Sequence, residues 1–161
     1  MGGKDKAQEV SRRIAPLVDI IVGGVDDFVQ SLGIKSNATN FSEIVSDVVD
    51  AYPNFQIIAS TKRDLKSATQ NSYSAIGWSK INGVVSSSIN LDVEVLDRVG
   101  AGDSFVSGLL YGLLNDMPLV TALDYGVAHG ALTMTTPGDN SMATLADVEE
   151  VIAGGSAQIK R

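Results

Sequence analysis

One short stretch of the chain combines a glycine-rich turn with a carboxylate and is the first candidate for chemistry. It reads Gly100, Ala101, Gly102 and Asp103, and it follows a segment with apolar, β-branched residues over positions 93–99. Apolar and small residues then recur with helical spacing at Ala101, Phe105, Gly108, Leu109, Gly112 and Leu113. The pattern therefore predicts a strand, a tight glycine turn and a helix.

A strand–glycine–helix turn is suited to binding an anion. The first N–H groups of a helix lack partners within the helix, and its dipole places partial positive charge there. Glycine lets a ligand approach the backbone without a Cβ in the way. A carboxylate beside a bound phosphate can take the proton from an attacking hydroxyl, so Asp103 is the candidate base. The alternative is a glycine-rich helix start in which Asp103 is only a first-turn charge.

A second candidate lies at Thr61, Lys62 and Arg63, directly after an apolar segment over residues 55–60. In open α/β sheets, ligands bind beyond the carboxyl ends of the strands, and arginine forms forked hydrogen bonds with phosphate. The alternative is a solvated pair of charges on a loop. His129, the only histidine, falls in the middle of an expected helix. We expect it in the core or in a pocket wall rather than in catalysis.

The elements that must position these residues alternate between strand and helix. We expect helices over residues 7–17, 26–32, 40–52, 101–113, 118–134 and 145–152, and strands over 18–23, 55–60, 73–78, 84–86 and 93–99. Asn40 and Thr144 are expected to cap helices, and Asn82 with Gly83 signals a hairpin. This order predicts the α/β class with a mostly parallel sheet.

Composition narrows the class of protein. The chain has 161 residues, a hydrophobic fraction of 44% and a charged fraction of 19%, as expected of one folded domain over residues 1–161. Its formal net charge of −7 argues against nucleic acid as a partner. No apolar run reaches the ~20 residues of a membrane span. With no cysteine and no apolar leader, we expect a cytoplasmic protein that binds no membrane.

The glycine turn resembles the C-terminal signature of the ribokinase-like (PfkB) carbohydrate kinases. The matching residues are Asp97-Arg98-Val99-Gly100-Ala101-Gly102-Asp103, followed by Ser107-Gly108-Leu109. With Arg98 after the first Asp, the motif is similar to that of bacterial 2-keto-3-deoxygluconate kinases. Segments 3–7, 59–63, 128–131 and 136–139 carry the same likeness. The resemblance covers nearly the whole chain, but only the C-terminal half of such an enzyme.

The resemblance implies a three-layer α/β/α ribokinase-like fold and the nucleotide-binding half of an ATP-dependent kinase. Asp103 would activate the primary hydroxyl of 2-keto-3-deoxygluconate, and the backbone from Gly100 to Gly102 would hold the charge developing on the transferred phosphoryl group. Nucleotide contacts would come from Thr61, Lys62, Arg63, Ala128, Ala131 and Gly138, the last three beside the adenine. For Mg²⁺, Gly24 stands where the family has Asn, so only Asp27 remains as a candidate ligand.

Two other nucleotide-binding motifs do not fit the sequence. A dinucleotide-binding fingerprint fails because Phe105 occupies the place of its third glycine, and no Gly-Lys-Ser/Thr triplet of a P-loop occurs. A non-catalytic nucleotide-binding or assembly module stays open, as does a kinase for another sugar such as fructose or ribose. The resemblance places the sugar and lid residues in the N-terminal half. Without that half, an apolar sheet edge would be exposed, so we expect either a homo-oligomer or a companion N-terminal half.

Overall fold

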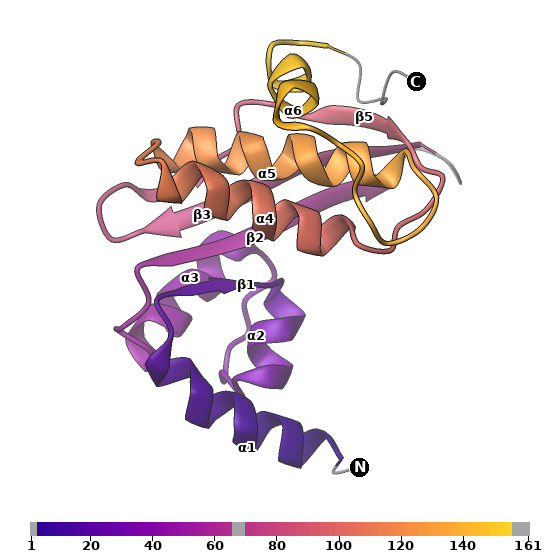
Figure 1. Cartoon of the computed structure of the whole chain (residues 1–161). Helices are drawn as coiled ribbons and strands as arrows, with labels where there is room; N and C mark the ends of the chain where they lie inside the picture. Colours follow the sequence, from indigo (N-terminus) through magenta and orange to yellow (C-terminus); the bar gives the residue numbers. More distant parts are fainter. Residues whose placement is uncertain (1–2, 66–69, 156–161) are drawn as a thin grey trace. The chain divides into compact units, whose positions relative to one another are not determined.

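A computed structural model describes residues 3–65 and 70–155 of the chain (Figure 1). The chain groups into two compact units. Unit 1 comprises Met1–Ser60 with Trp78–Val84, and unit 2 comprises Thr61–Gly77 with Val85–Arg161. A single domain over residues 1–161 stays a prediction.

Unit 1 is built from helices around one pair of parallel strands. Its elements are α1 (Lys4–Ile14), a short 3₁₀ helix (Ala15–Leu17), β1 (Ile20–Val22), α2 (Val25–Ser31), α3 (Phe41–Ala51) and the first part of β2 (Ile57–Leu65). β1 pairs in parallel with β2, with Ile20 opposite Ile57. The Asn40 side chain accepts a hydrogen bond from the Glu43 backbone N–H at 3.1 Å, so the expected cap of α3 is confirmed.

Unit 2 carries most of the remaining elements. They are β3 (Gln70–Ser79), β4 (Gly83–Ser86), β5 (Leu91–Glu94), α4 (Ala101–Leu114), α5 (Leu119–Met134) and α6 (Leu145–Ile152). β2, β3 and β4 each have residues in both units. The Thr144 side chain caps α6 through the Asp147 N–H at 3.3 Å, and the Asp147 carboxylate accepts the Thr144 N–H at 2.8 Å in return.

Helices α4 and α5 run side by side in unit 2 (Figure 1), and small residues set how closely they pack. A Cβ on Gly108 would lie 2.7 Å from the carbonyl carbon of Tyr125, and one on Gly126 would lie 2.8 Å from the Phe105 ring. Ordinary carbon contacts begin near 3.4 Å. The apolar and small residues that recur with helical spacing from Ala101 onward therefore include those with which α4 packs against α5, namely Phe105 and Gly108.

The strand pairing is mixed. Among the described residues the strand order is β1-β2-β3-β4, and β5 pairs antiparallel with β3, with Tyr73 opposite Leu91. The expected α/β class is confirmed, and the sheet is mixed, because the β1–β2 pair is parallel and the β3–β5 pair is antiparallel. The antiparallel pairing arises because strands 70–79 and 91–94 are joined without a crossover helix. Within the described ranges, none of the helices has the length and apolar character needed to span a membrane.

Candidate functional site

The glycine turn adopts a backbone conformation that requires glycine at its centre. Gly100 has φ of +78° and precedes the first residue of α4. A Cβ there would overlap the backbone carbonyl of Asp139, lying 3.0 Å from its carbon. Any other residue at this position would be strained, both by the positive φ and by the close approach of Asp139. Gly100 therefore lets the chain enter α4 while a second loop packs against the turn.

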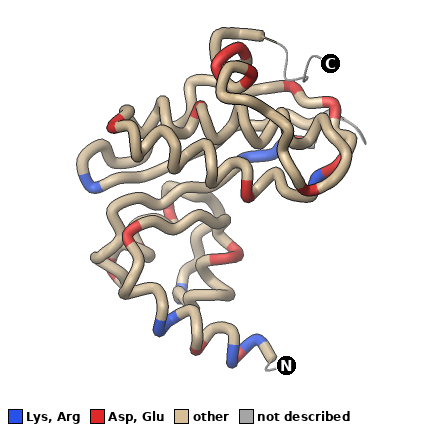
Figure 2. Tube along the Cα trace, in the orientation of Figure 1, with Lys and Arg blue, Asp and Glu red and all other residues tan. Residues whose placement is uncertain are grey.

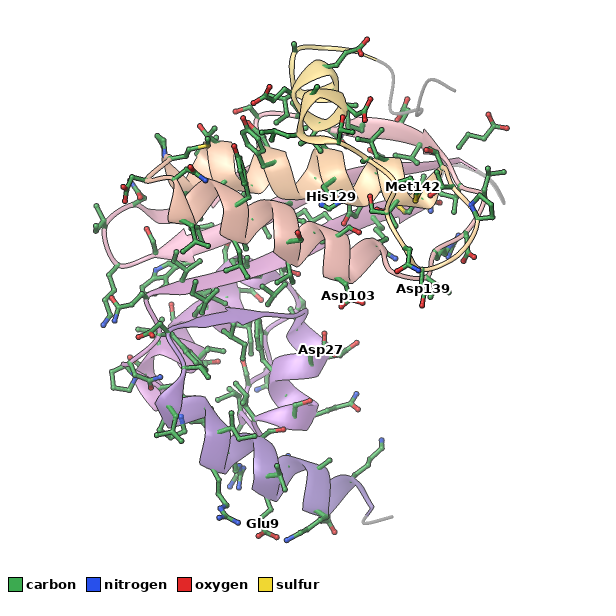
Figure 3. All side chains as sticks on the ribbon, viewed as in Figure 1. Glu9, Asp27, Asp103, His129, Asp139 and Met142 are labelled. Atoms are coloured by element: carbon green, nitrogen blue, oxygen red, sulfur yellow. The ribbon has the colours of Figure 1, made fainter. Side chains whose placement is uncertain are left out.

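The amino end of α4 is left open to a ligand. No side chain caps this helix, so its first amides keep the partial positive charge of an uncapped helix start. A Cβ on Gly102 would meet nothing within 4 Å, so the space beside Gly102 is open. Asp103 is exposed in the same turn (Figure 3). The structure thus brings the Asp103 carboxylate and the amides of an uncapped helix start to the same end of α4.

Asp97 joins this turn to the segment that follows α5. Its Oδ1 accepts the Val99 N–H at 3.0 Å, and its Oδ2 accepts the Gly138 N–H at 3.2 Å. These backbone donors hold the pKa of the Asp97 carboxyl below its ordinary value. Gly138, expected at the nucleotide, therefore lies beside the glycine turn. The clamping role of Asp97 was not expected, although the residue opens the motif that carries the family resemblance.

The approach to the turn differs from the sequence-based prediction. The expected strand over residues 93–99 ends at Glu94, and both Leu96 and Val99 are exposed. The backbone N–H groups of Leu96 and Asp97 donate to the Met134 carbonyl at 2.9 and 3.3 Å instead of to a neighbouring strand. A loop anchored on the end of α5, rather than a strand, therefore leads into α4.

The segment Thr61, Lys62 and Arg63 lies within β2 and not in a loop after a strand, so that expectation was wrong. Successive side chains of a strand point to opposite faces, so Thr61 and Arg63 share a face that Lys62 does not. The Arg63 guanidinium lies 5.4 Å from the centre of the Tyr73 ring. Tyr73 in turn reaches the start of α4, since a Cβ on Gly130 would touch both its hydroxyl and the Ala101 carbonyl. Arg63 therefore contacts a ring that packs near the first residue of α4, whereas the side chain of Lys62 lies on the other face of β2.

Ala128 and Ala131 are fully buried in α5, so neither small side chain faces an open pocket. The same stretch of helix presents His129, which helps to line a pocket of ≈170 Å³ with residues of α4, α5 and α6. The His129 Nε2 lies 2.8 Å from the Ser141 Oγ, and burial lowers the pKa of its imidazole. His129 is thus a pocket-wall residue, as expected. A nucleotide-binding role for Ala128 and Ala131 stays a prediction. Their buried methyl groups leave no exposed surface that a nucleotide could contact.

Asp27, the candidate metal ligand, belongs to unit 1 and lies in the first turn of α2 (Figure 3). Its Oδ2 accepts the Gly24 N–H at 2.8 Å, as a helix-capping carboxylate does. In the described part of the chain, no group of three or more His, Asp or Glu side chains could hold a metal ion. Figure 2 shows lysines and arginines spread along the chain rather than gathered in one segment.

Comparison with known proteins places the chain in a family. Residues 2–145 match the pfkB family carbohydrate kinases, and the chain belongs to this family. It is 29% identical to a 2-dehydro-3-deoxygalactonokinase of Haloferax volcanii over 156 residues, which are 96% of this chain and 44% of that protein. It is 31% identical to a 5-dehydro-2-deoxygluconokinase of Bacillus licheniformis over 144 residues, covering 89% of this chain and 40% of the relative.

Solved structures confirm the expected ribokinase-like fold. The crystal structure of 2-dehydro-3-deoxygluconokinase from Thermotoga maritima matches with a TM-score of 0.83 and 29% identity, over 94% of this chain and 46% of that one. The chain thus spans less than half the length of these relatives. The expected likeness to part of a 2-keto-3-deoxygluconate kinase is confirmed.

Proposed function

We propose that this chain is the nucleotide-binding and catalytic-base part of an ATP-dependent sugar kinase. The observation that carries the proposal is the uncapped start of α4, with open space beside Gly102 and the Asp103 carboxylate in the same turn. Membership of a carbohydrate kinase family supports it. A non-catalytic nucleotide-binding module has the same helix end but would have no use for an exposed base there.

In the proposed reaction, a primary hydroxyl of the sugar attacks the γ-phosphorus of ATP. A new O–P bond forms, the bond from the γ-phosphorus to the β–γ bridging oxygen breaks, and ADP leaves with that electron pair. Asp103 accepts the hydroxyl proton, and the amides from Gly100 to Gly102 stabilise the charge on the transferred group. Arg63 adds positive charge to the phosphates.

Mg²⁺ is expected to accompany the nucleotide and to neutralise charge on its phosphate oxygens when bound. Among the described residues, groups suited to binding phosphate are present at the start of α4, whereas a set of ligands suited to Mg²⁺ is not found. One oxygen of Asp27 already accepts a backbone hydrogen bond, and no cluster of ligands surrounds it in the described ranges. A metal-binding role for Asp27, which belongs to unit 1, stays a prediction.

For the substrate we propose 2-keto-3-deoxygluconate or a close relative. The names of the three relatives described above share one chemistry, since each describes the kinase of a six-carbon sugar acid with one keto and one deoxy carbon. A kinase for another sugar such as fructose or ribose is the alternative. Turnover of a complete enzyme that contains this chain, tested with each of these sugars, discriminates between them.

Calorimetry with ADP and Mg²⁺ tests the nucleotide site. We expect measurable heat that weakens on Arg63→Ala, because a charged hydrogen bond to phosphate contributes about 1.5–3 kcal/mol, or roughly tenfold to a hundredfold in affinity. Lys62→Ala is the matched control, since its side chain points to the other face of β2 and should leave the affinity nearly unchanged. Absence of binding by the wild-type chain at every accessible ADP concentration would refute the site.

The catalytic role is tested in a complete enzyme that contains this chain. Asp103→Asn should lower turnover by about 10²–10⁴-fold, the usual contribution of a general base, and should leave ADP binding largely intact. Gly102→Ala should weaken nucleotide binding, because the new Cβ would enter the space assigned to phosphate. Near-normal turnover by the Asn variant would remove Asp103 from the mechanism.

A partner is also part of the proposal. β1 ends the strand order of the described sheet, and its three side chains are only half-buried. Beside it lies a groove of ≈540 Å³, mostly apolar, to which Ile14, Ile21, Val22, Phe28 and Leu32 contribute. We propose that the family's remaining half covers this edge and that the isolated chain self-associates and lacks sugar kinase activity. A strictly monomeric chain in light scattering that phosphorylates the sugar unaided would overturn this.

A further inference from the structure

Tyr73 and Arg63 form a contact that the family motif does not include. Tyr73 has no exposed surface, whereas Arg63 is exposed, so the guanidinium lies on the outer side of a buried ring. The distance from the guanidinium carbon to the ring centre is 5.4 Å, within the range of a cation–π contact. Burial raises the pKa of the Tyr73 hydroxyl and the positive charge of Arg63 opposes this rise, so the phenol stays neutral.

The Tyr73 ring is held rigidly at both ends. Its backbone pairs with Leu91 in the β3–β5 ladder. Its hydroxyl lies against α5, where a Cβ on Gly130 would come within 2.8 Å of it and within 3.0 Å of the Ala101 carbonyl of α4. Gly130 therefore leaves room for the phenol beside the first residue of α4. The Tyr73 side chain thus lies between the Arg63 guanidinium and the place where α5 packs against the first residue of α4.

The contact with Tyr73 lowers the conformational entropy that Arg63 loses when it binds a ligand. A solvent-exposed arginine samples many rotamers and loses that freedom when it binds a ligand. Stacking on a fixed ring limits the freedom beforehand, and the planar guanidinium can still present N–H groups at its edge. A lysine ammonium has no planar face with which to stack in this way.

We propose that Tyr73 is a positioning residue, which holds Arg63 so that its guanidinium and the first amides of α4 bind the same polyphosphate of a nucleotide. The inference rests on the proposed nucleotide site and deepens it by assigning the origin of its affinity. Tyr73 itself is buried and touches no ligand.

A double-mutant cycle on ADP affinity tests the proposal, with calorimetry on wild type, Arg63→Ala, Tyr73→Leu and the double variant. Tyr73→Leu should weaken ADP binding by about threefold to thirtyfold, the range of a cation–π contact, and should have almost no further effect once Arg63 is replaced. Tyr73→Phe keeps the ring and should retain more ADP affinity than Tyr73→Leu. A purely structural role for Tyr73 predicts instead that the two losses add, and this result would overturn the inference.

Two further measurements guard against a Tyr73→Leu variant that does not fold. Arg63→Lys alters only an exposed side chain, and it should bind ADP less tightly than wild type but more tightly than Arg63→Ala. The ammonium keeps the charge but lacks the planar face that stacks on the ring and the fork of N–H donors. Affinity close to wild type for the Lys variant would contradict the proposal. In the wild-type chain, NMR should show the Arg63 side-chain protons shifted upfield by the Tyr73 ring, and unshifted protons would also contradict it. If wild type fails to bind ADP at all, the proposed nucleotide site fails, which is a different outcome from additive losses.

Discussion

Replacing Gly108 by alanine tests whether glycine sets the spacing between α4 and α5. An alanine in the middle of a helix is intrinsically about 1 kcal/mol more favourable than glycine. The new Cβ would overlap the Tyr125 carbonyl oxygen and lie 2.7 Å from its carbon, and both atoms belong to the backbone. Relief therefore requires the two helices to separate, because neither contact can be avoided by turning a side chain.

Separating α4 from α5 also affects the other close approaches along the same seam. Ala122 lies 2.6 Å from the Cβ position of Gly112, and the Phe105 ring lies 2.8 Å from that of Gly126. Overpacking of a tight core typically costs about 1–3 kcal/mol, and a rigid backbone neighbour favours the upper end of that range. After the gain in helix propensity, we expect Gly108→Ala to be about 1–2 kcal/mol less stable than wild type.

The matched control is Gly102→Ala in the first turn of the same helix. Its Cβ would meet nothing within 4 Å, so it should leave stability unchanged or raise it by up to about 1 kcal/mol. Urea unfolding followed by circular dichroism measures both variants, and their difference isolates the packing cost. A Gly108 variant as stable as the Gly102 variant would refute the argument that glycine is required for the α4–α5 spacing.

Other predictions concern side chains of unit 2. Asp124→Ala should cost about 1–3 kcal/mol in urea unfolding, because the buried Asp124 carboxylate accepts the N–H groups of Ser88 and Ile89 at 2.7 and 3.2 Å. Burial lowers the pKa of His129 from 6.5, so its contribution to stability is present above pH 6.5 and is lost as the pH falls through the lower folded pKa. Unfolding midpoints measured from pH 8 to pH 5 should show this loss in wild type and a smaller one in His129→Gln. Thr144→Ala removes the cap of α6 and should cost about 0.5–2 kcal/mol in thermal unfolding, with little change if the cap is dispensable.

The sequence by itself determined those features that depend on neighbours along the chain. Asn40 and Thr144 cap α3 and α6 as predicted, because a cap joins a side chain to an amide three residues away. The positive φ values of Gly83 and Gly100 follow from turn chemistry in the same way. The helical repeat from residue 101 placed α4 and its buried face correctly. The motif around Gly100 was enough to identify the family.

Only the tertiary structure decided which side chains meet across the chain. The sequence pattern placed Arg63 in a loop, but β2 continues through it because pairing with other strands, and not local propensity, decides where a strand ends. The Asp97 carboxylate reaches Gly138, and Arg63 reaches Tyr73, over separations that no local spacing encodes. The small side chain of Ala128 suggested a place in a pocket wall, but a small side chain also packs well between helices, and Ala128 is fully buried in unit 2. These contacts depend on how helices and strands pack, and packing is a property of the folded chain as a whole.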